Sequence, residues 1–484
     1  MIKIKTSEVL QKKLPLVLLE KKEKMPEASF FSKEEYQYLK QMKEKDEKTI
    51  VINRYTNFVI VHFVNKSTDD SYAFLEECRK AGARVNETIS RHSAEVVQVS
   101  SSSCSPQALM ACAEGLSLAS YRFTRYLTTN EKKKTSLKEI VVVHKSLQKK
   151  EAIEVQTLIE AVYKARDLVN EPANHLNAVQ LAHALASLCK EAGCKTEILN
   201  KKQIESLRMG GLLAVNRGSV DPPSFTIMEW KPAQKVNKQP LVLVGKGLVY
   251  DTGGLSLKPT QDSMDYMKSD MAGAAAVACA LYAIAMNRLP IHVIALVPST
   301  DNRPGFNAYA PGDIIRMYNG MTVENMNSDA EGRMILADAI AYAKKYNPEL
   351  LINVATLTGS ASMAVGPYAM VAMGTADRKV MDRLKECGEK TWERMVEFPL
   401  WDEYGEMLKS DIADLRNIGG RSAGAIVGGK FLEKFAPCPF IHLDIAGIAF
   451  NKTAEGYKPK GGTGACVRLL YHFARQLADQ YKNK

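Results

Sequence analysis

The chain has 484 residues, of which 46% are apolar, and it carries a formal net charge of +11. This length indicates two or three domains, and the apolar content is typical of a globular protein. No apolar run approaches the ~18 residues that a membrane-spanning helix needs, and the start, Met1–Lys5, lacks the apolar core of a signal peptide.

The nine cysteines are scattered along the chain, and none forms a C-x-x-C pair. An odd number of separate cysteines indicates a reducing compartment and argues against zinc held by thiolates. We therefore expect a cytoplasmic protein with no membrane partner.

The positive charge is concentrated in the first third of the chain. Residues 1–150 hold 27 lysines and arginines against 18 aspartates and glutamates. Such a region can attract nucleic acid or another anionic surface. Lysines alternate with acids between Lys21 and Lys48, and no helix-turn-helix, zinc-finger or RNP-like pattern is present. We favour a solvated lysine-rich surface and do not expect nucleic acid as a partner.

The first 150 residues alternate between short apolar runs and helical patterns, which predicts a small N-terminal α/β domain at 1–150. The predicted strands are 14–19, 50–52, 58–61 and 140–144, and the predicted helices are 71–83 and 106–117. The charged run Glu131–Lys134 is expected to be an exposed loop.

A long helical pattern follows from Glu151 to Asn170, and Pro172 ends it. We interpret residues 151–174 as a linking helix between the N-terminal domain and a catalytic domain at 175–484.

The second part alternates more clearly, with largely apolar strands separated by helices. The predicted strands are 241–244, 293–297, 350–354 and 440–443, and the predicted helices are 271–287, 333–345 and 463–477. This pattern predicts a doubly wound, mostly parallel sheet covered on both faces. Ligands bind at the carboxyl ends of the strands in such sheets, where this chain has polar, glycine-rich turns.

The segment Asn327–Arg333 places two carboxylates, Asp329 and Glu331, two residues apart ahead of a helical pattern. In an extended segment both side chains would point the same way and repel each other unless a proton or a cation lay between them. The alternative interpretation is a capping box formed by Ser328 and Glu331 at the start of the helix.

A second charged cluster lies upstream, at Lys246, Asp251, Lys258 and Asp270. Each residue alone has an ordinary explanation: Asp270 as a helix N-cap, Asp251 as a turn residue, and the lysines as solvated loop residues. Together with Asp329 and Glu331 they place carboxylates at consecutive strand ends. A shared divalent cation would relieve the repulsion among them.

The chemistry of these ligands limits the choice of metal. There is no H-E-x-x-H motif, and the eight histidines show no ligand spacing. Carboxylates with one amine favour zinc, manganese, cobalt or magnesium. Two such ions with a bridging hydroxide would make a hydrolase, and a nearby lysine and arginine would stabilise a developing oxyanion.

Several motifs occur in order between about residues 160 and 477, and Asn327–Arg333 is the most specific of them. They include Val244-Gly-Lys-Gly247, Tyr250-Asp-Thr-Gly-Gly254, Leu257-Lys-Pro259, Asn327-Ser-Asp-Ala-Glu-Gly-Arg333, Ala355-Thr-Leu-Thr-Gly359 and His442-Leu-Asp-Ile-Ala-Gly447. Together they resemble the leucine aminopeptidase (cytosol aminopeptidase) family of dizinc metallopeptidases. Residues 1–150 carry no matching motif.

The resemblance implies two divalent metal ions per subunit, zinc in first place, with manganese, cobalt or magnesium as alternatives. Asp251 and Glu331 would bridge both ions, Asp329 would complete one site, and Lys246 as a neutral amine would complete the other with Asp270.

The resemblance also implies catalytic and binding roles. Lys258 would polarise the scissile carbonyl. Arg333 would hold a bicarbonate that acts as general base, with help from the backbones of Gly332 and Leu357. The substrate pocket would be lined by Met267, Thr356, Leu357 and Gly359.

The resulting expectation is an aminopeptidase acting on peptides with a free N-terminus, preferably with Leu or Met first, in a homohexamer. Two departures from the family pattern stand out: Ser328 replaces a threonine, and the loop Thr260–Ser263 is one residue longer, which could shift Met267. The rival hypotheses are a DNA-binding regulator and a structural pseudoenzyme.

Overall fold

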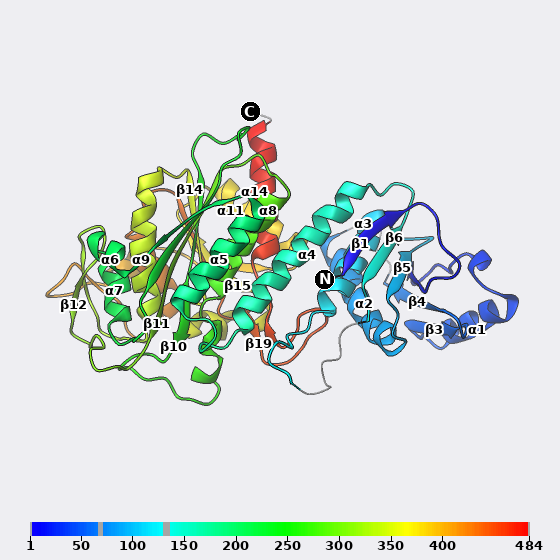
Figure 1. The fold of residues 1–484 in the computed structure, drawn as a ribbon, viewed down its shortest axis with the longest axis horizontal. Coiled ribbons are helices and arrows are strands. Elements are labelled where there is room, and N and C mark those ends of the chain that lie inside the picture. Colours follow the sequence, from blue (N-terminus) through cyan, green and yellow to red (C-terminus); the bar gives the residue numbers. More distant parts are fainter. Residues whose placement is uncertain (1, 66–70, 129–135, 483–484) are drawn as a thin grey trace. The chain divides into compact units, whose positions relative to one another are not determined.

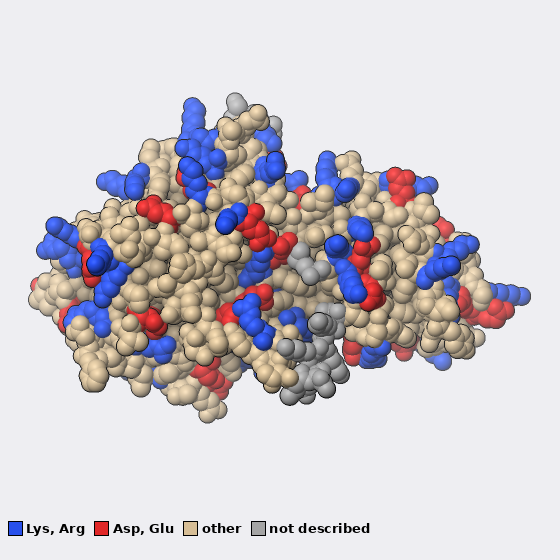
Figure 2. Space-filling view, viewed as in Figure 1, with Lys and Arg blue, Asp and Glu red and all other residues tan. Residues whose placement is uncertain are grey.

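The computed structural model describes residues 2–65, 71–128 and 136–482. The loop predicted at Glu131–Lys134 lies outside these residues. On the face shown in Figure 2, lysines and arginines lie interspersed with aspartates and glutamates.

The chain divides into two units. The first comprises Met1–Tyr163 and Thr453–Lys460, and the second comprises Lys164–Lys452 and Gly461–Lys484. The first division falls within the helix α4 (Lys149–Asn170), which is labelled in Figure 1. The domain limits of 1–150, 151–174 and 175–484 stay predictions.

The first unit is built on a six-stranded sheet in the order β1-β6-β5-β2-β4-β3. β3 pairs antiparallel with β4, and the other pairings are parallel. The strands are β1 (Lys3–Ser7), β2 (Leu16–Lys21), β3 (Thr49–Asn53), β4 (Phe58–Val64), β5 (Val96–Ser100) and β6 (Glu139–Val143). The helices are η1 (Ala28–Phe30), α1 (Lys33–Glu44), α2 (Tyr72–Arg91) and α3 (Pro106–Ala119). The helix predicted to end at residue 83 continues to Arg91, because Val85 and Ile89 extend its buried face.

The segment Thr453–Lys460 belongs to the first unit, although the strands on either side of it, β19 (Phe450–Asn451) and β20 (Gly461–Gly462), belong to the second. Within the first unit the side chain of Tyr457 is buried, and its hydroxyl donates a hydrogen bond of 2.9 Å to Glu76 Oε2.

The second unit contains a nine-stranded sheet in the order β16-β15-β18-β14-β9-β11-β8-β7, with β10 paired to β11. The central strands β18, β14, β9 and β11 are mutually parallel, whereas β15, β8 and β7 join antiparallel. The strands are β7 (Lys195–Leu199), β8 (Ser224–Trp230), β9 (Leu241–Gly245), β10 (Gly247–Asp251), β11 (Val293–Asn302), β14 (Leu350–Ala355), β15 (Met370–Gly374), β16 (Met395–Glu397) and β18 (Phe440–Asp444). A smaller sheet is formed by β12 (Ile314–Arg316), β13 (Thr322–Glu324) and β17 (Leu415–Arg416).

Helices cover both faces of the large sheet, which confirms the predicted doubly wound, mostly parallel fold (Figure 1). One set comprises α5 (Ala178–Ala192), α8 (Ala272–Met286), α11 (Arg378–Thr391) and α14 (Val467–Lys482), and the other comprises α6 (Lys201–Ser206), α7 (Gly210–Asn216), α9 (Glu331–Tyr342) and α13 (Gly424–Glu433). The remaining helical segments are η2 (Met264–Ser269), η3 (Ala343–Tyr346), α10 (Gly359–Val365), η4 (Gly366–Tyr368) and α12 (Glu403–Glu406).

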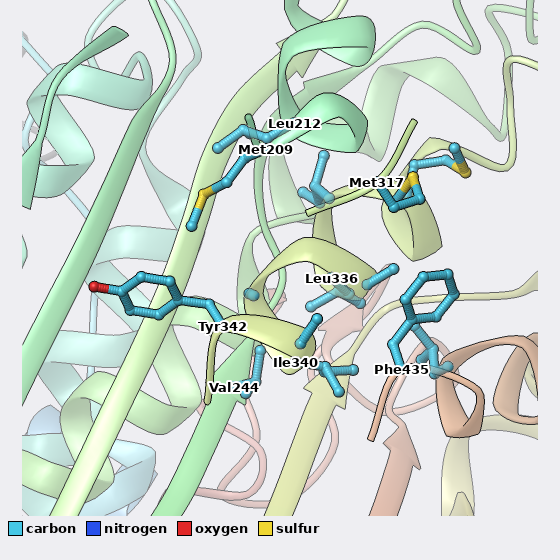
Figure 3. Packing of buried hydrophobic residues seen from close by; sticks show 14 of the residues in the cluster. Met209, Leu212, Val244, Met317, Leu336, Ile340, Tyr342 and Phe435 are labelled. Carbon is cyan, nitrogen blue, oxygen red and sulfur yellow. The ribbon is translucent and has the colours of Figure 1, made fainter. Parts of the chain in front are cut away.

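The core fixes α9 against the sheet. Leu336 and Ile340 of α9 belong to one buried cluster with Val244 of β9 and Leu212 of α7 (Figure 3). This packing sets the first turn of α9 beside the carboxyl end of β9.

The start of α8 also comes close to the sheet, because Gly273 has no side chain. A Cβ atom at this position would lie 2.1 Å from the carbonyl oxygen of Val354 in β14. Only glycine allows this approach, which brings Asp270 to the end of β9.

The segment Met264–Met286 is an exception to the expected absence of long apolar runs. It has the length and composition of a membrane-crossing helix, but 94% of its most apolar window is buried inside the protein. Its apolar side chains therefore serve the core of the second unit.

Asp338 is a fully buried carboxylate within α9. Its Oδ2 accepts a hydrogen bond from the backbone N–H of Leu212 at 2.9 Å, and its Oδ1 accepts one from Tyr318 at 2.8 Å. Burial raises the pKa of this carboxyl to about 7. Asp338 thus ties α7 and the strand connection after β12 to α9.

Replacing Asp338 by alanine should reduce the free energy of unfolding by about 2–5 kcal/mol, because two buried backbone N–H groups lose their acceptor. The shift is measured by urea denaturation followed by circular dichroism. Asp382→Ala, which removes a partner from an exposed ion pair with Arg378, should shift stability by less than about 1 kcal/mol. Equal shifts in the two variants would contradict the assigned role of Asp338.

Candidate metal centre

The predicted charged residues converge at the carboxyl edge of the large sheet. Lys246 follows β9, Asp251 ends β10, and Asp270 precedes α8. Asp329 lies in the turn before α9, and Glu331 is the first residue of that helix.

Two lysines, the buried Lys246 and the partly buried Lys258, each bridge two carboxylates. Lys246 Nζ lies 2.7 Å from Asp270 Oδ2 and 3.0 Å from Glu331 Oε1. Lys258 Nζ lies 2.9 Å from Asp251 Oδ2 and 2.5 Å from Asp329 Oδ1. The predicted alternative of solvated loop lysines is therefore wrong for both.

The carboxylates are close enough to share a cation. One oxygen each from Asp251, Asp329 and Glu331 can be chosen so that all three lie within 4.8 Å of one another. Glu331 Oε2 is buried and has no hydrogen-bond partner among the described residues. The four carboxylates outnumber the two ammonium groups, and this oxygen-rich set suits a borderline or hard divalent ion.

Burial and mutual repulsion alter the acid–base behaviour of the cluster. Burial, together with Asp251, raises the pKa of Glu331 to about 8, and burial raises the pKa of Asp270 to about 6. Burial alone would lower the pKa of Lys246, but Asp270, Glu331 and Asp251 outweigh it and raise that pKa. The cluster is therefore more stable when protons or cations neutralise its carboxylates than when the carboxylates carry uncompensated negative charge.

The two capping interpretations are wrong. Ser328 Oγ donates to the carbonyl of Gly253 at 2.7 Å and accepts from the backbone of Ser256 at 2.8 Å, so it does not cap α9. Asp270 lies before the N-cap residue of α8 and receives hydrogen bonds from Lys246 and from Thr356 Oγ1. A turn, not an extended segment, brings Asp329 and Glu331 together.

The turn interpretation of Asp251 accounts for only part of its environment. Its Oδ1 accepts a hydrogen bond of 2.8 Å from the backbone of Gly253, as in an Asx turn. The same oxygen accepts one of 3.0 Å from Asn302 Nδ2, which also donates to the carbonyl of Ser328. Asn302, at the end of β11, was not predicted from the sequence. Its position among polar residues at a strand end was the available signal.

Arg333 lies in the first turn of α9, two residues after Glu331, and is 6% exposed. Its Nη1 donates to the carbonyl of Asn417 at 2.6 Å, while its buried Nε has no acceptor within the part of the chain that the structure describes. Burial lowers the pKa of this guanidinium to about 10. A buried guanidinium N–H without an acceptor fits a small anion such as bicarbonate.

The residues predicted to line the substrate pocket differ in their contacts and in their exposure. Thr356 contacts Lys246 and Asp270, and Leu357 follows it, with its backbone N–H donating to Asp444 Oδ1 at 3.0 Å. Met267 is half-buried in η2, and Gly359 is exposed at the start of α10. The role of these residues in substrate binding stays a prediction.

Gly332 leaves room for the side chain of Lys246. A Cβ atom at Gly332 would lie 2.4 Å from Lys246 Cε and 2.6 Å from its Nζ. Gly332→Ala should displace the lysine and weaken Mn²⁺ binding by about 10-fold or more, as measured by calorimetric titration of metal-stripped protein. Gly405→Ala, at a glycine where a Cβ atom would make only ordinary van der Waals contacts, the nearest 3.5 Å from Lys430 Cε, serves as a control that should bind Mn²⁺ as the wild type does. Unchanged Mn²⁺ affinity in folded Gly332→Ala would contradict this arrangement.

Divalent metal binding should strengthen as the pH rises from about 6 to about 8. Below the raised pKa values of Asp270, about 6, and Glu331, about 8, a bound proton must leave before a cation can bind. Titration in two buffers of different ionisation enthalpy measures the protons released. An Mn²⁺ affinity independent of pH over this range would contradict the shifted pKa values.

The chain is similar to known proteins over most of its length. The model of the cytosol aminopeptidase family, catalytic domain, matches residues 163–471. The "Probable cytosol aminopeptidase" of Chlorobaculum parvum is 52% identical over 309 residues, which are 63% of this chain and 61% of that protein. The protein of the same description from Chlorobaculum tepidum is 47% identical over 372 residues, which are 74% of this chain and 73% of that protein.

Solved structures with the same fold include the bottromycin maturation enzyme BotP. It is 28% identical, with a TM-score of 0.84 over 96% of this chain and 99% of BotP. BotP in complex with Mn aligns with a TM-score of 0.85 over 97% of this chain and 100% of that protein.

Proposed function

This chain belongs to the cytosol aminopeptidase family, and from that premise we propose that it hydrolyses the N-terminal residue from peptides in a metal-dependent reaction. The family match and the descriptions of the relatives support a hydrolase of the aminopeptidase type. The preferred first residue is apolar, such as Leu or Met, by resemblance to the family.

The observation that carries the proposal is the cluster of carboxylates at Asp251, Asp329 and Glu331. One oxygen each from Glu331, Asp251 and Asp329 fits a single divalent ion, and the buried Oε2 of Glu331 has no hydrogen-bond partner among the described residues. Asp251 and Glu331 would bridge two ions, Asp329 would complete one site, and Lys246 with Asp270 would complete the other. When bound, the ions would supply Lewis-acid polarisation and an activated water.

The ligands limit the metal to zinc, manganese, cobalt or magnesium. Zinc is our first choice by resemblance to the family, with the other three as alternatives. The description of BotP in complex with Mn supports manganese as a competent ion. Lys246 could bind a metal only as a neutral amine, so a proton would leave its ammonium group on binding.

The residues of the chain would divide the remaining work. Lys258, held between Asp251 and Asp329, would donate a hydrogen bond to the oxygen of the scissile carbonyl as negative charge develops there. Arg333 would hold bicarbonate through its Nε. The backbone N–H of Leu357 already donates to Asp444. We therefore propose that Arg333 and the backbone of Gly332, ahead of Leu357, are the main contacts of the anion.

The assembly and location follow the family. We propose a homohexamer acting in the cytoplasm, supported by the resemblance and by the cytosolic description of the relatives. Sedimentation of the purified protein measures the assembly state, and a monomer at micromolar concentration would contradict it.

Loss of one carboxylate should abolish most activity. Asp329→Ala should lower kcat/KM for a chromogenic leucyl substrate by about 100-fold or more, because even residues that only support metal ligands contribute about 10–100-fold. Chelation of the wild-type protein should have the same effect, and added Mn²⁺ or Zn²⁺ should reverse it. Asp382→Ala serves as the control. Full activity in folded Asp329→Ala would show that the site is assigned wrongly.

A panel of aminoacyl substrates tests the preference for the first residue. Leu and Met should be hydrolysed faster than Glu or Lys at equal concentration, because half-buried Met267 would offer apolar contact and no opposite charge. Faster hydrolysis of Glu or Lys would contradict the proposed preference while leaving the aminopeptidase assignment intact.

A further inference from the structure

Asn417 is a buried asparagine that uses all of its polar groups. It follows β17 and has no exposed surface. Its Nδ2 donates to Asn325 Oδ1 and to the carbonyl of Asn327, both at 2.8 Å, and its Oδ1 accepts from the backbone of Met326 at 2.7 Å. Its backbone N–H donates to the carbonyl of Glu324 at 3.0 Å.

These bonds hold the loop that carries one of the proposed metal ligands. Residues 325–328 lie between β13 and the turn before α9. Asn417 contacts three of them in succession, and the next hydrogen bond, from the Asp329 backbone to Asn327 Oδ1 at 2.8 Å, fixes the ligand itself. The position of Asp329 therefore depends on a residue 88 positions further along the chain.

The same residue also contacts the proposed anion site. The carbonyl of Asn417 accepts the 2.6 Å hydrogen bond from Arg333 Nη1. This bond orients the guanidinium whose Nε has no acceptor among residues 2–65, 71–128 and 136–482. The side chain of Asn417 holds Asp329, and its backbone holds Arg333.

We infer that Asn417 is a positioning residue that fixes the Asp329 loop and the Arg333 guanidinium in their positions relative to each other. The inference rests on the proposed function, because the two groups matter as metal ligand and anion holder. Residues that support a metal ligand typically contribute about 10–100-fold in affinity or activity. Asn417 would act without touching substrate, so its loss should lower kcat and leave KM nearly unchanged.

The chain offers a matched control in Asn237. This asparagine is 3% exposed and also makes three side-chain hydrogen bonds: Nδ2 donates to the carbonyls of Gln239 and His292, and Oδ1 accepts from the backbone of His292. It lies ahead of β9 and beside the start of β11, at the amino ends of these strands. A purely structural contribution should be similar for the two residues.

The test compares Asn417→Ala, Asn417→Asp and Asn237→Ala in the full chain. Calorimetric titration of metal-stripped protein with Mn²⁺ should show a Kd raised about 10–100-fold in both Asn417 variants and close to the wild-type value in Asn237→Ala. Thermal unfolding of the metal-free proteins should show similar losses for the two alanine variants. With a leucyl substrate and saturating Mn²⁺, kcat should fall about 10-fold in the Asn417 variants, with little change in KM.

The aspartate variant keeps the volume and the oxygen that accepts from Met326, but it loses both donated bonds. If the alanine variant does not fold, the aspartate variant is used for the test instead. Wild-type Mn²⁺ affinity and kcat in a folded Asn417 variant, or equal losses in Asn237→Ala, would overturn the inference. Failure of the wild-type protein itself to bind Mn²⁺ or Zn²⁺ would instead overturn the proposed function.

Discussion

The arrangement of the candidate metal centre depends on two ammonium groups placed between four carboxylates, of which Asp251, Asp270 and Glu331 are buried and Asp329 is partly exposed. Removing several like charges from water costs several kcal/mol per ion unless opposite charges compensate closely. Lys246 and Lys258 supply that compensation at distances of 2.5–3.0 Å. Two glycines permit the close packing around Lys246: Gly273 lets α8 contact β14, and Gly332 leaves space for the lysine side chain. The close packing of the second unit thus allows the lysines and the carboxylates of the candidate metal centre to pair.

Most of the fold could be predicted because burial imposes a period on the sequence. The parallel core strand β9 is a continuous apolar run, β14 and β18 are apolar apart from Asn353, His442 and Asp444, and the long helices show a regular apolar stripe. The boundaries were less predictable where tertiary pairing overrides composition. The strand predicted to end at Val297 continues to Asn302, since its polar residues Ser299–Asn302 are buried against β10. The antiparallel additions β7, β8 and β15 depend on contacts that no local pattern reveals.

The candidate site was predictable in its residues but not in its geometry. Motif order and the resemblance named the carboxylates and the lysines, and the structure places them together. The extended arrangement considered for this segment does not occur, because Asp329 lies in a turn and Glu331 opens a helix. The supporting residues Asn302 and Asn417 were missed. Their hydrogen bonds reach residues tens of positions away, and a single sequence carries no record of such pairing.

The path of the backbone has a consequence for how this protein could be divided or recombined. The chain passes between its two units three times, because Thr453–Lys460 returns to the first unit after the second has begun. A fragment that stops at Tyr163 lacks this segment and leaves Glu76 without the hydroxyl of Tyr457. No single cleavage, gene fusion or crossover near α4 can therefore transfer the first unit intact. Exchange of that unit between relatives would have to carry an eight-residue insert as well.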